Sequence, residues 1–431
     1  MTASVALPPV APAQLEPLSP EHAETIRATL PLVGQHIEEI APVFYGKMLS
    51  AHPELLADTF NRGNQAQGAQ QKALAASVAT YATLLVTPDA PSPRDLLGRI
   101  GHKHASLGIT EDQYQIVHDN LMAAIVEVLG ADVVTAPVAE AWDAVYWHMA
   151  RTLIDFEKEL YGWAGVAAGD VFRTARVLER RDESSTVASL VLGAPEGGEA
   201  LPPFVPGQYI SVGVVLSDGA RQLRQYSLSD AADDGTWRIT VKRVDADGSS
   251  PAGEVSTALH EQVREGDEIQ VTLPFGDLTI DPEATTPVVL VSAGIGATPM
   301  LGILRHIAAH QPERPVTVLH ADSDAADAAL VAELAETVEA LPEGTTSSLR
   351  LWFSSGLEPA AADAVRASDR VAITQGRLAI EATAIPEGAD VYLCGSAGFL
   401  QGARAQLMEL GIPEERVHLE LFAPNDWLLP A

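Results

Sequence analysis

Two histidines lie two residues apart in the segment RIGHKHASLGITEDQY, which offers few other side chains capable of chemistry. Because imidazole is a common metal ligand, His102 and His104 could form a two-histidine metal site. If the segment is helical, however, two residues along the chain turn a side chain by about 200°, so the two rings face different sides. A lone histidine is more often a hydrogen-bonded core or surface group than a ligand. The pair alone leaves these interpretations open.

A second candidate site is the segment VVLVSAGIGATPM. It is typical of an apolar strand followed by Gly294 and Gly296, which would let a phosphate approach the backbone. Thr298 is expected to cap the next helix, with Pro299 as its first residue, and the helix N-terminus offers N–H groups to an anion. Because Pro299 stands where the dinucleotide fingerprint ends in glycine, a plain tight turn is the alternative. VYLCGSAGF adds a second strand and turn, and two such strand ends side by side form a ligand crevice.

Between these segments, RQYSLS combines a cation, an aromatic ring and a hydroxyl group. Arg224 can pair with a phosphate, Tyr226 can lie flat on an aromatic ring, and Ser227 can donate a hydrogen bond to a ring nitrogen. Further along the chain, GEVST (253–257) predicts a glycine-led turn and helix start that could hold a pyrophosphate. Taken alone, RQYSLS could equally be a strand of mixed exposure.

Three regions with different hydrophobic patterns must position these groups. Residues 19–161 are predicted to be an all-α domain of six or more helices, with Ser19 as the first N-cap and Pro20 as the first helical residue. The expected helices span residues 21–40, 42–51, 69–85, 93–104, 111–129 and 134–161. Short β-rich runs predict an antiparallel β-barrel within residues 168–281. Alternating strands and helices predict a doubly wound α/β domain at residues 286–431, and the Pro-rich residues 1–18 are expected to be flexible.

The composition excludes several classes of protein. The net charge of −31, from 27 Lys and Arg against 58 Asp and Glu, argues against nucleic acid and anionic membrane surfaces as partners. The single cysteine, Cys394, argues against disulfides and iron–sulfur clusters, and with no secretory signal it predicts a cytoplasmic protein. The uncharged run 284–304 is long enough for a membrane span, but its glycines and proline favour a strand, turn and helix. No stable membrane insertion is therefore expected.

Taken in order, these motifs resemble those of known proteins. RQYS, then GEVS, then the glycine-rich turn is similar to the ferredoxin–NADP reductase superfamily, as are FVPGQY and PFGDL. The helical region, with FYGKML, HPEL, FNRGNQ and KHASLGITEDQY, resembles a globin. Together with SAGIGATPML and YLCG, the chain resembles a flavohaemoglobin from about residue 21 to residue 424. The resemblance implies a globin domain, an FAD-binding barrel and an NAD(P)-binding domain, with haem b, FAD and NAD(P)H as cofactors.

On the proximal side of the haem, the resemblance implies that His104 is the iron ligand and that His102 is not. Tyr114 and Glu157 would hydrogen-bond to one another and to the His104 imidazole, which would push electron density onto the iron. Lys103 matches a position that tunes the redox centres in this family.

On the distal side, the resemblance implies that Tyr45 donates a hydrogen bond to bound dioxygen. Gln70 and Leu74 would complete that pocket, and Phe60 would pack against the haem. Glu420 matches the second position that tunes the redox centres.

The resemblance also implies nucleotide contacts. FAD would be held by Tyr209, Arg224, Gln225, Tyr226, Ser227, Gly253, Val255, Ser256, Leu421, Phe422, Ala423 and Pro424. NAD(P)H would be held at two strand ends, by Gly294, Ile295, Gly296, Ala297, Thr298, Pro299, Cys394 and Gly395. Phe422 is the expected stacking ring. Leu421 and Ala423 stand where the family favours Cys and Gly, which would change the packing at the flavin edge.

The function implied by this resemblance is nitric oxide detoxification. NAD(P)H would reduce FAD, FAD would reduce the haem iron, and ferrous-oxy haem would convert nitric oxide to nitrate. The partners would be small molecules, namely nitric oxide, dioxygen and NAD(P)H, and the protein is expected to be a monomer. The alternatives are a haem and flavin reductase acting on hydroperoxides or quinones, a haem-based gas sensor or carrier, and a flavin reductase whose helical domain has lost its haem.

Overall fold

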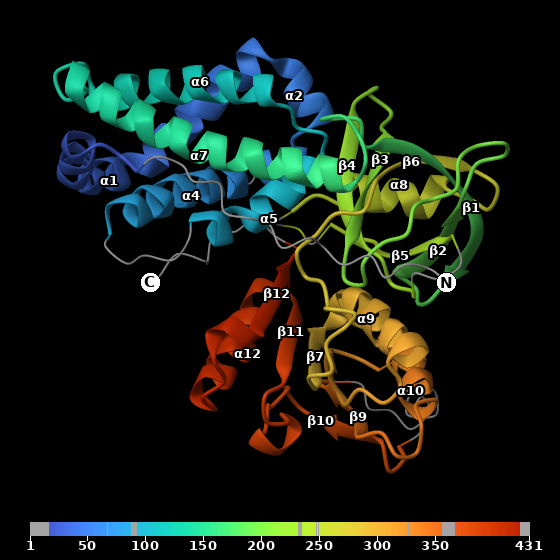
Figure 1. Ribbon diagram of the computed structural model, residues 1–431. Helices are drawn as coiled ribbons and strands as arrows, with labels where there is room; N and C mark the ends of the chain where they lie inside the picture. The colour runs from blue at the N-terminus through green and yellow to red at the C-terminus, as the bar shows by residue number, and fades with distance from the viewer. Residues whose placement is uncertain are drawn as a thin grey trace. The chain divides into compact units, whose positions relative to one another are not determined.

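The computed structural model describes residues 17–66, 68–87, 93–231, 235–246, 248, 250–325, 327–355 and 367–422. These residues form two compact units (Figure 1). The helical unit contains the described residues between 17 and 173, together with residues 213–224. The sheet unit contains residues 174–212 and the described residues between 225 and 422.

The helical unit begins with a capped helix, as predicted. Ser19 is the N-cap of α1, its side chain accepting a hydrogen bond from the His22 N–H at 3.1 Å, and Pro20 is the first helical residue. The helices are α1 (Pro20–Ala51), α2 (Pro53–Asp58), α3 (Arg62–Ala66), α4 (Ala69–Val86), α5 (Pro93–Ser106), α6 (Glu111–Leu129) and α7 (Ala136–Trp163). This arrangement confirms the predicted all-α fold.

Helix α1 runs unbroken through Pro31 and Pro42, so the predicted break before Pro42 is wrong. A proline inside a helix removes one backbone hydrogen bond and disfavours the helix. Burial outweighs that effect here, because Ile26, Ile40 and Met48 lie on one face of α1 and are at most 1% exposed. That face packs against other helices of the unit in a single core.

The strands between residues 172 and 272 form a curled antiparallel sheet, which confirms the predicted barrel. They are β1 (Phe172–Asp182), β2 (Val187–Gly193), β3 (Tyr209–Val215), β4 (Arg221–Ser227), β5 (Trp237–Lys242) and β6 (Glu268–Thr272), with helix α8 (Glu254–Gln262) between β5 and β6. Their order in the sheet is β4-β3-β6-β1-β2-β5. The two ends of the sheet meet, because Leu228, just after β4, bridges to Ile239 in β5. Closure protects the strand edges from pairing with other chains.

The second sheet is parallel, which confirms the predicted doubly wound α/β fold. Its strands are β7 (Val288–Ala293), β8 (Val316–Asp322), β9 (Ser347–Phe353), β10 (Val371–Gln375), β11 (Asp390–Gly395) and β12 (Val417–Leu421), and its helices are α9 (Ala297–His310), α10 (Val331–Glu339) and α12 (Ala397–Glu409). The strand order is β10-β9-β8-β7-β11-β12. The order reverses between β7 and β11, so the topological switch point, where open α/β sheets bind ligands, lies there.

A buried ion-pair cluster lies inside the sheet unit. Arg238 of β5 is only 2% exposed and pairs with Glu333 of α10 at 2.7 Å. Arg305 of α9 bonds to the same carboxylate and to Asp230 at 2.6 Å. A buried guanidinium needs such partners, because an unpaired interior charge is costly. The cluster ties β5 to α9 and α10.

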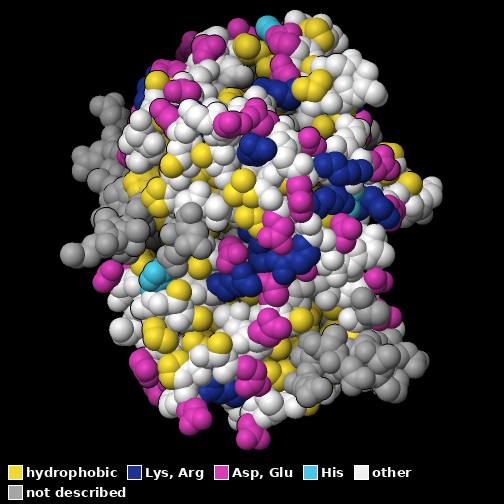
Figure 2. Space-filling model, turned by 90° about the vertical axis from the view of Figure 1, so that its right-hand side faces the viewer, with side chains coloured by type: hydrophobic (Ala, Val, Ile, Leu, Met, Phe, Trp, Pro, Cys, Tyr) yellow, Lys and Arg dark blue, Asp and Glu magenta, His cyan; other side chains and the backbone are white. Residues whose placement is uncertain are grey.

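Acidic side chains are spread over the face shown in Figure 2 and do not gather in one patch. A net charge of −31 distributed in this way is typical of a solvated surface. Among the described residues, no helix is long and apolar enough to cross a membrane. The uncharged run 284–304 forms β7, a short 3₁₀ turn and the start of α9, as the sequence predicts.

Candidate functional site

Three helices bring together a histidine, a tyrosine and a carboxylate. His104 lies in the last turn of α5, Tyr114 near the start of α6 and Glu157 in α7. The His104 Nδ1 lies 2.8 Å from Glu157 Oε1 and 3.0 Å from the Tyr114 hydroxyl oxygen. The Tyr114 hydroxyl donates to Glu157 Oε1 at 2.5 Å. The resemblance implies hydrogen bonds among these same three residues.

The protonation states in this group follow from its partners. A carboxylate only accepts hydrogen bonds, so His104 Nδ1 and the Tyr114 hydroxyl both donate to Glu157. Burial and the charge of Glu157 raise the pKa of Tyr114, which keeps its phenol protonated. With the proton on Nδ1, His104 Nε2 keeps its lone pair, and no described residue hydrogen-bonds to that atom. Because the His104 side chain is 32% exposed while Glu157 is buried, Nε2 can bind a metal with a carboxylate fixed behind the ring.

His102 has different surroundings from His104. It is 5% exposed, and its ring meets Phe156 edge-on with centroids 5.4 Å apart. In the part of the chain that the structure describes, no group of three or more His, Cys, Asp or Glu could hold a metal ion. A haem, which needs one protein ligand, fits the surroundings of His104. Lys103, between the two histidines, is exposed.

An aromatic pair joins α1 to the segment after α2. The buried Tyr45 ring meets Phe60 edge-on, with centroids 5.9 Å apart, and Leu74 packs against the same core. Burial raises the pKa of Tyr45, so its hydroxyl stays protonated, and none of the described residues hydrogen-bonds to it. Gln70 lies in α4, and its side chain is outside the described residues. The Tyr45 hydroxyl can donate to a small ligand in largely apolar surroundings.

The RQYSLS segment forms most of β4. Side chains alternate along a strand, so Arg224 and Tyr226 face one side, while Gln225 and Ser227 face the other. Arg224 donates to Asn61 Oδ1 at 2.8 Å, and Gln225 donates across to β3 at 3.0 Å. Tyr226 is half-buried and Ser227 is buried. The cation and the ring predicted to contact a cofactor therefore share one face of the strand.

The motifs FVPGQY and PFGDL pack on one another. Tyr209 and Phe275 exchange backbone hydrogen bonds of 2.7 and 2.9 Å. At Gly207, where φ is +101°, a Cβ would lie 1.8 Å from the Leu278 carbonyl oxygen. At Gly276, where φ is +129°, a Cβ would lie 3.1 Å from the Tyr209 ring. Glycine is required at both positions because the left-handed backbone and the close approach exclude other side chains.

The GEVST segment forms the predicted turn and helix start, with Gly253 as the N-cap of α8. The Ser256 hydroxyl donates to the Gly253 carbonyl at 3.1 Å and accepts from the Val244 N–H at 3.2 Å. Val255 and Ser256 are both buried. The backbone N–H groups of this helix start are therefore better placed to meet an anion than the Ser256 hydroxyl, which is already paired.

The glycine turn after β7 is present, but its cap differs from the prediction. Residues Gly294–Gly296 form a 3₁₀ turn that runs directly into α9, with Gly296 as the N-cap. Thr298 lies inside the first turn of α9 and its hydroxyl donates to the Ile295 carbonyl at 2.9 Å, so its predicted capping role is wrong. Pro299 is the third helical residue, not the first, and is tolerated because first-turn N–H groups have no intrahelical partner.

The two predicted strand ends lie side by side at the switch point. A Cβ on Gly296 would lie 2.4 Å from the Cys394 carbonyl oxygen, and one on Gly395 would lie 2.7 Å from the Phe399 ring. Cys394 is fully buried. Gly294 and Ile295 are partly exposed, whereas Ala297, Thr298 and Pro299 are buried. A ligand at this crevice would therefore meet the first half of the turn.

The last described strand carries the C-terminal candidates. Glu420 and Leu421 of β12 are both 6% exposed. Phe422 follows and is 49% exposed, so its ring is accessible for stacking. Ala423 and Pro424 lie outside the described residues.

One contact set was not predicted from the sequence. Gln222, fully buried in β4, donates to the carbonyl oxygens of Leu56 and Ala57 at 3.0 and 3.1 Å. Arg62 donates to Asp218 at 2.6 Å in the same helical unit. These partners are more than 150 residues apart, and no local pattern links them. The order of motifs along the chain was the only available signal.

Comparison with known proteins finds two family matches in the chain. Residues 43–153 match the Globin family, and residues 290–405 match the Oxidoreductase NAD-binding domain family. The flavohemoprotein of Bordetella parapertussis is 40% identical over 421 residues, covering 94% of this chain and 98% of that protein. The flavohemoprotein of Rhizobium meliloti is 37% identical over 417 residues, covering 95% and 99%.

Solved structures of similar proteins match this chain as well. The flavohemoglobin of Malassezia yamatoensis, which has bound FAD and heme, matches with a TM-score of 0.82 at 34% identity, covering 95% of this chain and 100% of that chain. The FAD/NAD-binding domain of the nitric oxide dioxygenase of Vibrio cholerae matches with a TM-score of 0.50 at 36% identity, covering 58% of this chain and 99% of that chain. Since the similarity spans nearly the full length of both this chain and its relatives, the chain belongs to the flavohemoprotein family.

Proposed function

We propose that this flavohemoprotein is a nitric oxide dioxygenase that uses NAD(P)H as electron donor. The observation that carries the proposal is the hydrogen-bonded group of His104, Tyr114 and Glu157. A buried carboxylate behind an imidazole increases electron donation through Nε2, and such donation favours activation of a ligand over reversible storage. The Vibrio cholerae relative is named a nitric oxide dioxygenase, which supports the same activity.

Three cofactors fit the described residues. Haem b would bind at His104 Nε2, which keeps its lone pair. The residues that would hold FAD are Arg224 of β4, the start of α8 and the exposed Phe422 ring. NAD(P)H would bind at the switch point, beside the glycine turn. When bound, these groups supply the redox chemistry: electrons from NAD(P)H pass through flavin to haem, where nitric oxide and dioxygen are converted to nitrate.

The chain's own residues would orient the haem ligand and tune the potentials of the cofactors. Glu157 holds the Nδ1 proton, which fixes the tautomer and the ring orientation of His104. Tyr45 offers a protonated hydroxyl in apolar surroundings, where a hydrogen bond to a polar ligand is stronger than in water. Gln70, Leu74 and Phe60 would complete that pocket. Lys103 and Glu420 would tune the haem and flavin potentials through their charges.

We infer that the partners of the protein are small molecules and that it acts as a monomer in the cytoplasm. Buried Cys394 forms no disulfide bond, which suits a reducing compartment. The domain boundaries proposed from the sequence, residues 19–161, 168–281 and 286–431, assign one cofactor to each domain.

The test is a comparison of activities on the purified holoprotein. We expect nitric oxide to be consumed only when dioxygen and NADH or NADPH are both present, with one nitrate formed for each nitric oxide consumed. The control is reduction of ferricyanide, a quinone and an alkyl hydroperoxide by the same preparation. If nitric oxide consumption were slower than these reductions, or if no nitrate accumulated, the protein would be a reductase instead.

A further inference from the structure

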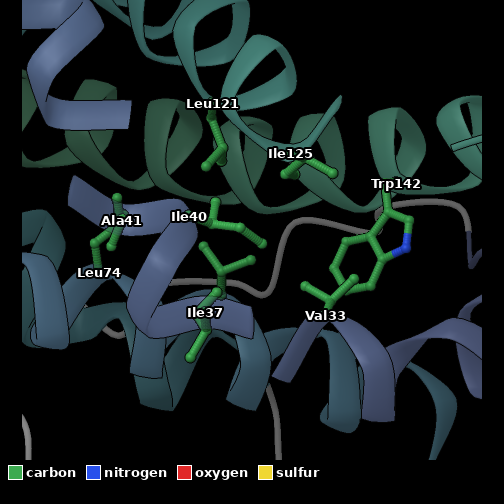
Figure 3. Close-up of a pocket in the computed structure, with 9 residues that line it drawn as sticks. Val33, Ile37, Ile40, Ala41, Leu74, Leu121, Ile125 and Trp142 are labelled. Atoms are coloured by element: carbon green, nitrogen blue, oxygen red, sulfur yellow. The ribbon is translucent and has the colours of Figure 1, made fainter. Parts of the chain in front are cut away.

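The interiors of the two units differ in chemistry. In the helical unit, the side chains around a small cavity beside Leu74 are all apolar (Figure 3). In the sheet unit, two arginines and two carboxylates lie together, and two of these residues, Arg238 and Glu333, are at most 8% exposed. Apolar residues of similar volume often stabilise a fold at least as well as a buried ion pair, so this cluster indicates a role beyond stability.

The cluster joins the curled-sheet fold to the parallel-sheet fold, and each fold supplies one cation and one anion. Arg238 of β5 and Asp230, between β4 and β5, belong to the curled-sheet fold. Arg305 of α9 and Glu333 of α10 belong to the parallel-sheet fold. Glu333 Oε2 accepts from Arg238 Nη1 at 2.7 Å and also from Arg305 Nη2. Arg305 Nη1 donates to Asp230 Oδ1 at 2.6 Å. A slide of one fold past the other would therefore separate both cross-pairs.

Helix α9 also meets the curled-sheet fold at a glycine. A Cβ on Gly302 would lie 2.5 Å from the Leu228 carbonyl oxygen, which is closer than real Cβ atoms approach, so only glycine allows this contact. Gly302 and Arg305 are three residues apart and share one face of α9. Their partners, Leu228 and Asp230, lie in the same short segment. The charge cluster and the glycine contact together fix α9 on segment 228–230.

This contact lies next to residues proposed to hold both nucleotide cofactors. Segment 228–230 directly follows Tyr226 and Ser227 of β4, which would hold FAD. Helix α9 directly follows the turn Gly294–Gly296, which would hold NAD(P)H. Gly302 lies only about 9 Å along α9 from that turn. The position of α9 on segment 228–230 therefore sets the position of the turn relative to β4.

We propose that Glu333 and Arg305 are positioning residues, which hold the glycine turn against β4 at the separation that hydride transfer needs. In that transfer the nicotinamide ring loses one hydride, a proton with two electrons, and the flavin ring gains it, so the nucleotide leaves oxidised and the flavin is reduced. Both residues would act through the position of α9, since their charged groups are bonded to Arg238 and Asp230. The proposal rests on the proposed use of NAD(P)H and FAD, and it does not depend on nitric oxide.

The first test widens the contact without changing any charge. In Gly302→Ala the added methyl group must move α9 from Leu228 by about 1 Å, and a shift of that size can slow a reaction by about 100-fold. We expect anaerobic reduction of the flavin, by NADH or NADPH, whichever the wild type oxidises faster, to slow by about 10- to 100-fold. The dissociation constant of the nucleotide should change little. Gly402→Ala in α12 is the matched control, because the space around Gly402 is open, and it should keep the wild-type rate.

A second readout does not depend on turnover. A nicotinamide ring stacked on a reduced flavin gives a long-wavelength absorption band, whose intensity falls when the rings separate. In mixtures of the reduced holoprotein with the oxidised nucleotide, we expect that band to be weaker in Gly302→Ala and unchanged in Gly402→Ala. A loss of stability alone would leave the band intact in the folded protein.

The charge cluster is tested with a mild and a stronger substitution. Arg305→Lys keeps the charge, but an ammonium group cannot bridge two carboxylates as a guanidinium fork does, so flavin reduction should slow and the band should weaken. Glu333→Gln removes the shared charge and should have the larger effect on both. Arg370→Lys is the matched control, because Arg370 donates to the Leu341 and Pro342 carbonyl oxygens at 2.7 and 2.6 Å, inside the parallel-sheet fold. It should keep the wild-type rate and band.

The outcomes separate this proposal from the dioxygenase. Equal reduction rates and equal bands in the wild type, Gly302→Ala and Arg305→Lys would overturn the positioning role, even in a protein that forms nitrate. Weaker nucleotide binding with an unchanged band would also overturn it. Slower reduction with a weaker band in both variants would support the positioning role even if the wild type formed no nitrate, which would contradict the dioxygenase alone.

Discussion

His104 of the helical unit and His320 of the sheet unit differ in exposure and in the partner of Nδ1. In the helical unit, His104 is 32% exposed at its side chain and its Nδ1 lies against the buried carboxylate of Glu157. In the sheet unit, His320 is fully buried and its Nδ1 lies 2.9 Å from the neutral Ser292 hydroxyl. Its Nε2 has no hydrogen-bond partner in the described part of the chain.

The difference shows that the partner of Nδ1 and the exposure of the ring together decide what a histidine can do. A carboxylate partner fixes the Nδ1 proton on His104 and makes an accessible Nε2 a strong ligand. Burial lowers the pKa of His320 to about 4, so its ring is neutral at neutral pH. Because the ring is fully buried, Nε2 is not accessible to a ligand from solvent. His320 is therefore a structural residue of β8, whereas His104 is the proposed iron ligand.

The largest expected effect is the loss of haem on changing His104. In His104→Ala the absorption band of bound haem should disappear, because the proposed iron ligand is removed, while NADH-dependent ferricyanide reduction should continue. His320→Ala is the matched change in the other unit and should keep the haem spectrum. A normal haem band in purified His104→Ala would assign the ligand to another residue and end the distinction between the two histidines.

The second effect tests the carboxylate behind His104. Glu157→Gln keeps the shape but removes the charge, and a change of this kind behind a metal ligand typically costs about 10–100-fold in activity. We expect nitric oxide consumption to fall by that factor, the iron–histidine stretching frequency in the Raman spectrum to fall, and the haem midpoint potential to rise. Tyr114→Phe, which leaves the carboxylate in place, should change both spectroscopic readouts less. An unchanged stretching frequency in Glu157→Gln would mean that Glu157 only supports the fold.

The third effect is a pH dependence of stability from His320. Its pKa falls from 6.5 in the unfolded chain to about 4 in the fold, so between these values the unfolded chain binds a proton that the folded chain does not. The stabilisation is complete above pH 6.5 and is lost as the pH falls toward 4. Between pH 7 and pH 5 the loss should be about 2 kcal/mol. His320→Asn keeps a partner for Ser292 but cannot titrate. Urea unfolding at both pH values should therefore show a smaller loss of unfolding free energy in this variant than in the wild type. Equal losses in the two proteins would contradict the role given to His320.

The smallest effect concerns the support of the His104 group. The Tyr146 hydroxyl donates to the Tyr114 carbonyl at 2.6 Å, and Tyr146→Phe should cost about 1 kcal/mol in the free energy of unfolding. Tyr161→Phe is the control, because the Tyr161 hydroxyl makes the same type of bond to the Ile109 carbonyl. Both variants should lose similar stability, and only Tyr146→Phe should shift the iron–histidine stretching frequency. A shift in neither variant would show that the Tyr146 hydroxyl does not position Tyr114.

Local signals in the sequence were sufficient where a local interaction decides the structure. Ser19 caps α1 and Gly253 caps α8 because a cap depends on its neighbours along the chain. Local signals failed at Pro42 and Thr298. At Pro42, burial of one helix face outweighs the local cost of a proline. At Thr298, the 3₁₀ turn continues into the helix and moves the cap to Gly296.

The sequence by itself determined the order of the three folds, the two glycine turns and the candidate histidine, because periodicity, turn chemistry and motif order are properties of neighbouring residues. Only the tertiary structure decided that His104 Nδ1 lies against the buried carboxylate of Glu157. It also decided that Gln222 bonds to the helical unit and that a cavity remains beside Leu74. These features depend on atoms that meet after tens to more than a hundred residues of intervening chain, and side-chain packing is settled only when all the elements are in place.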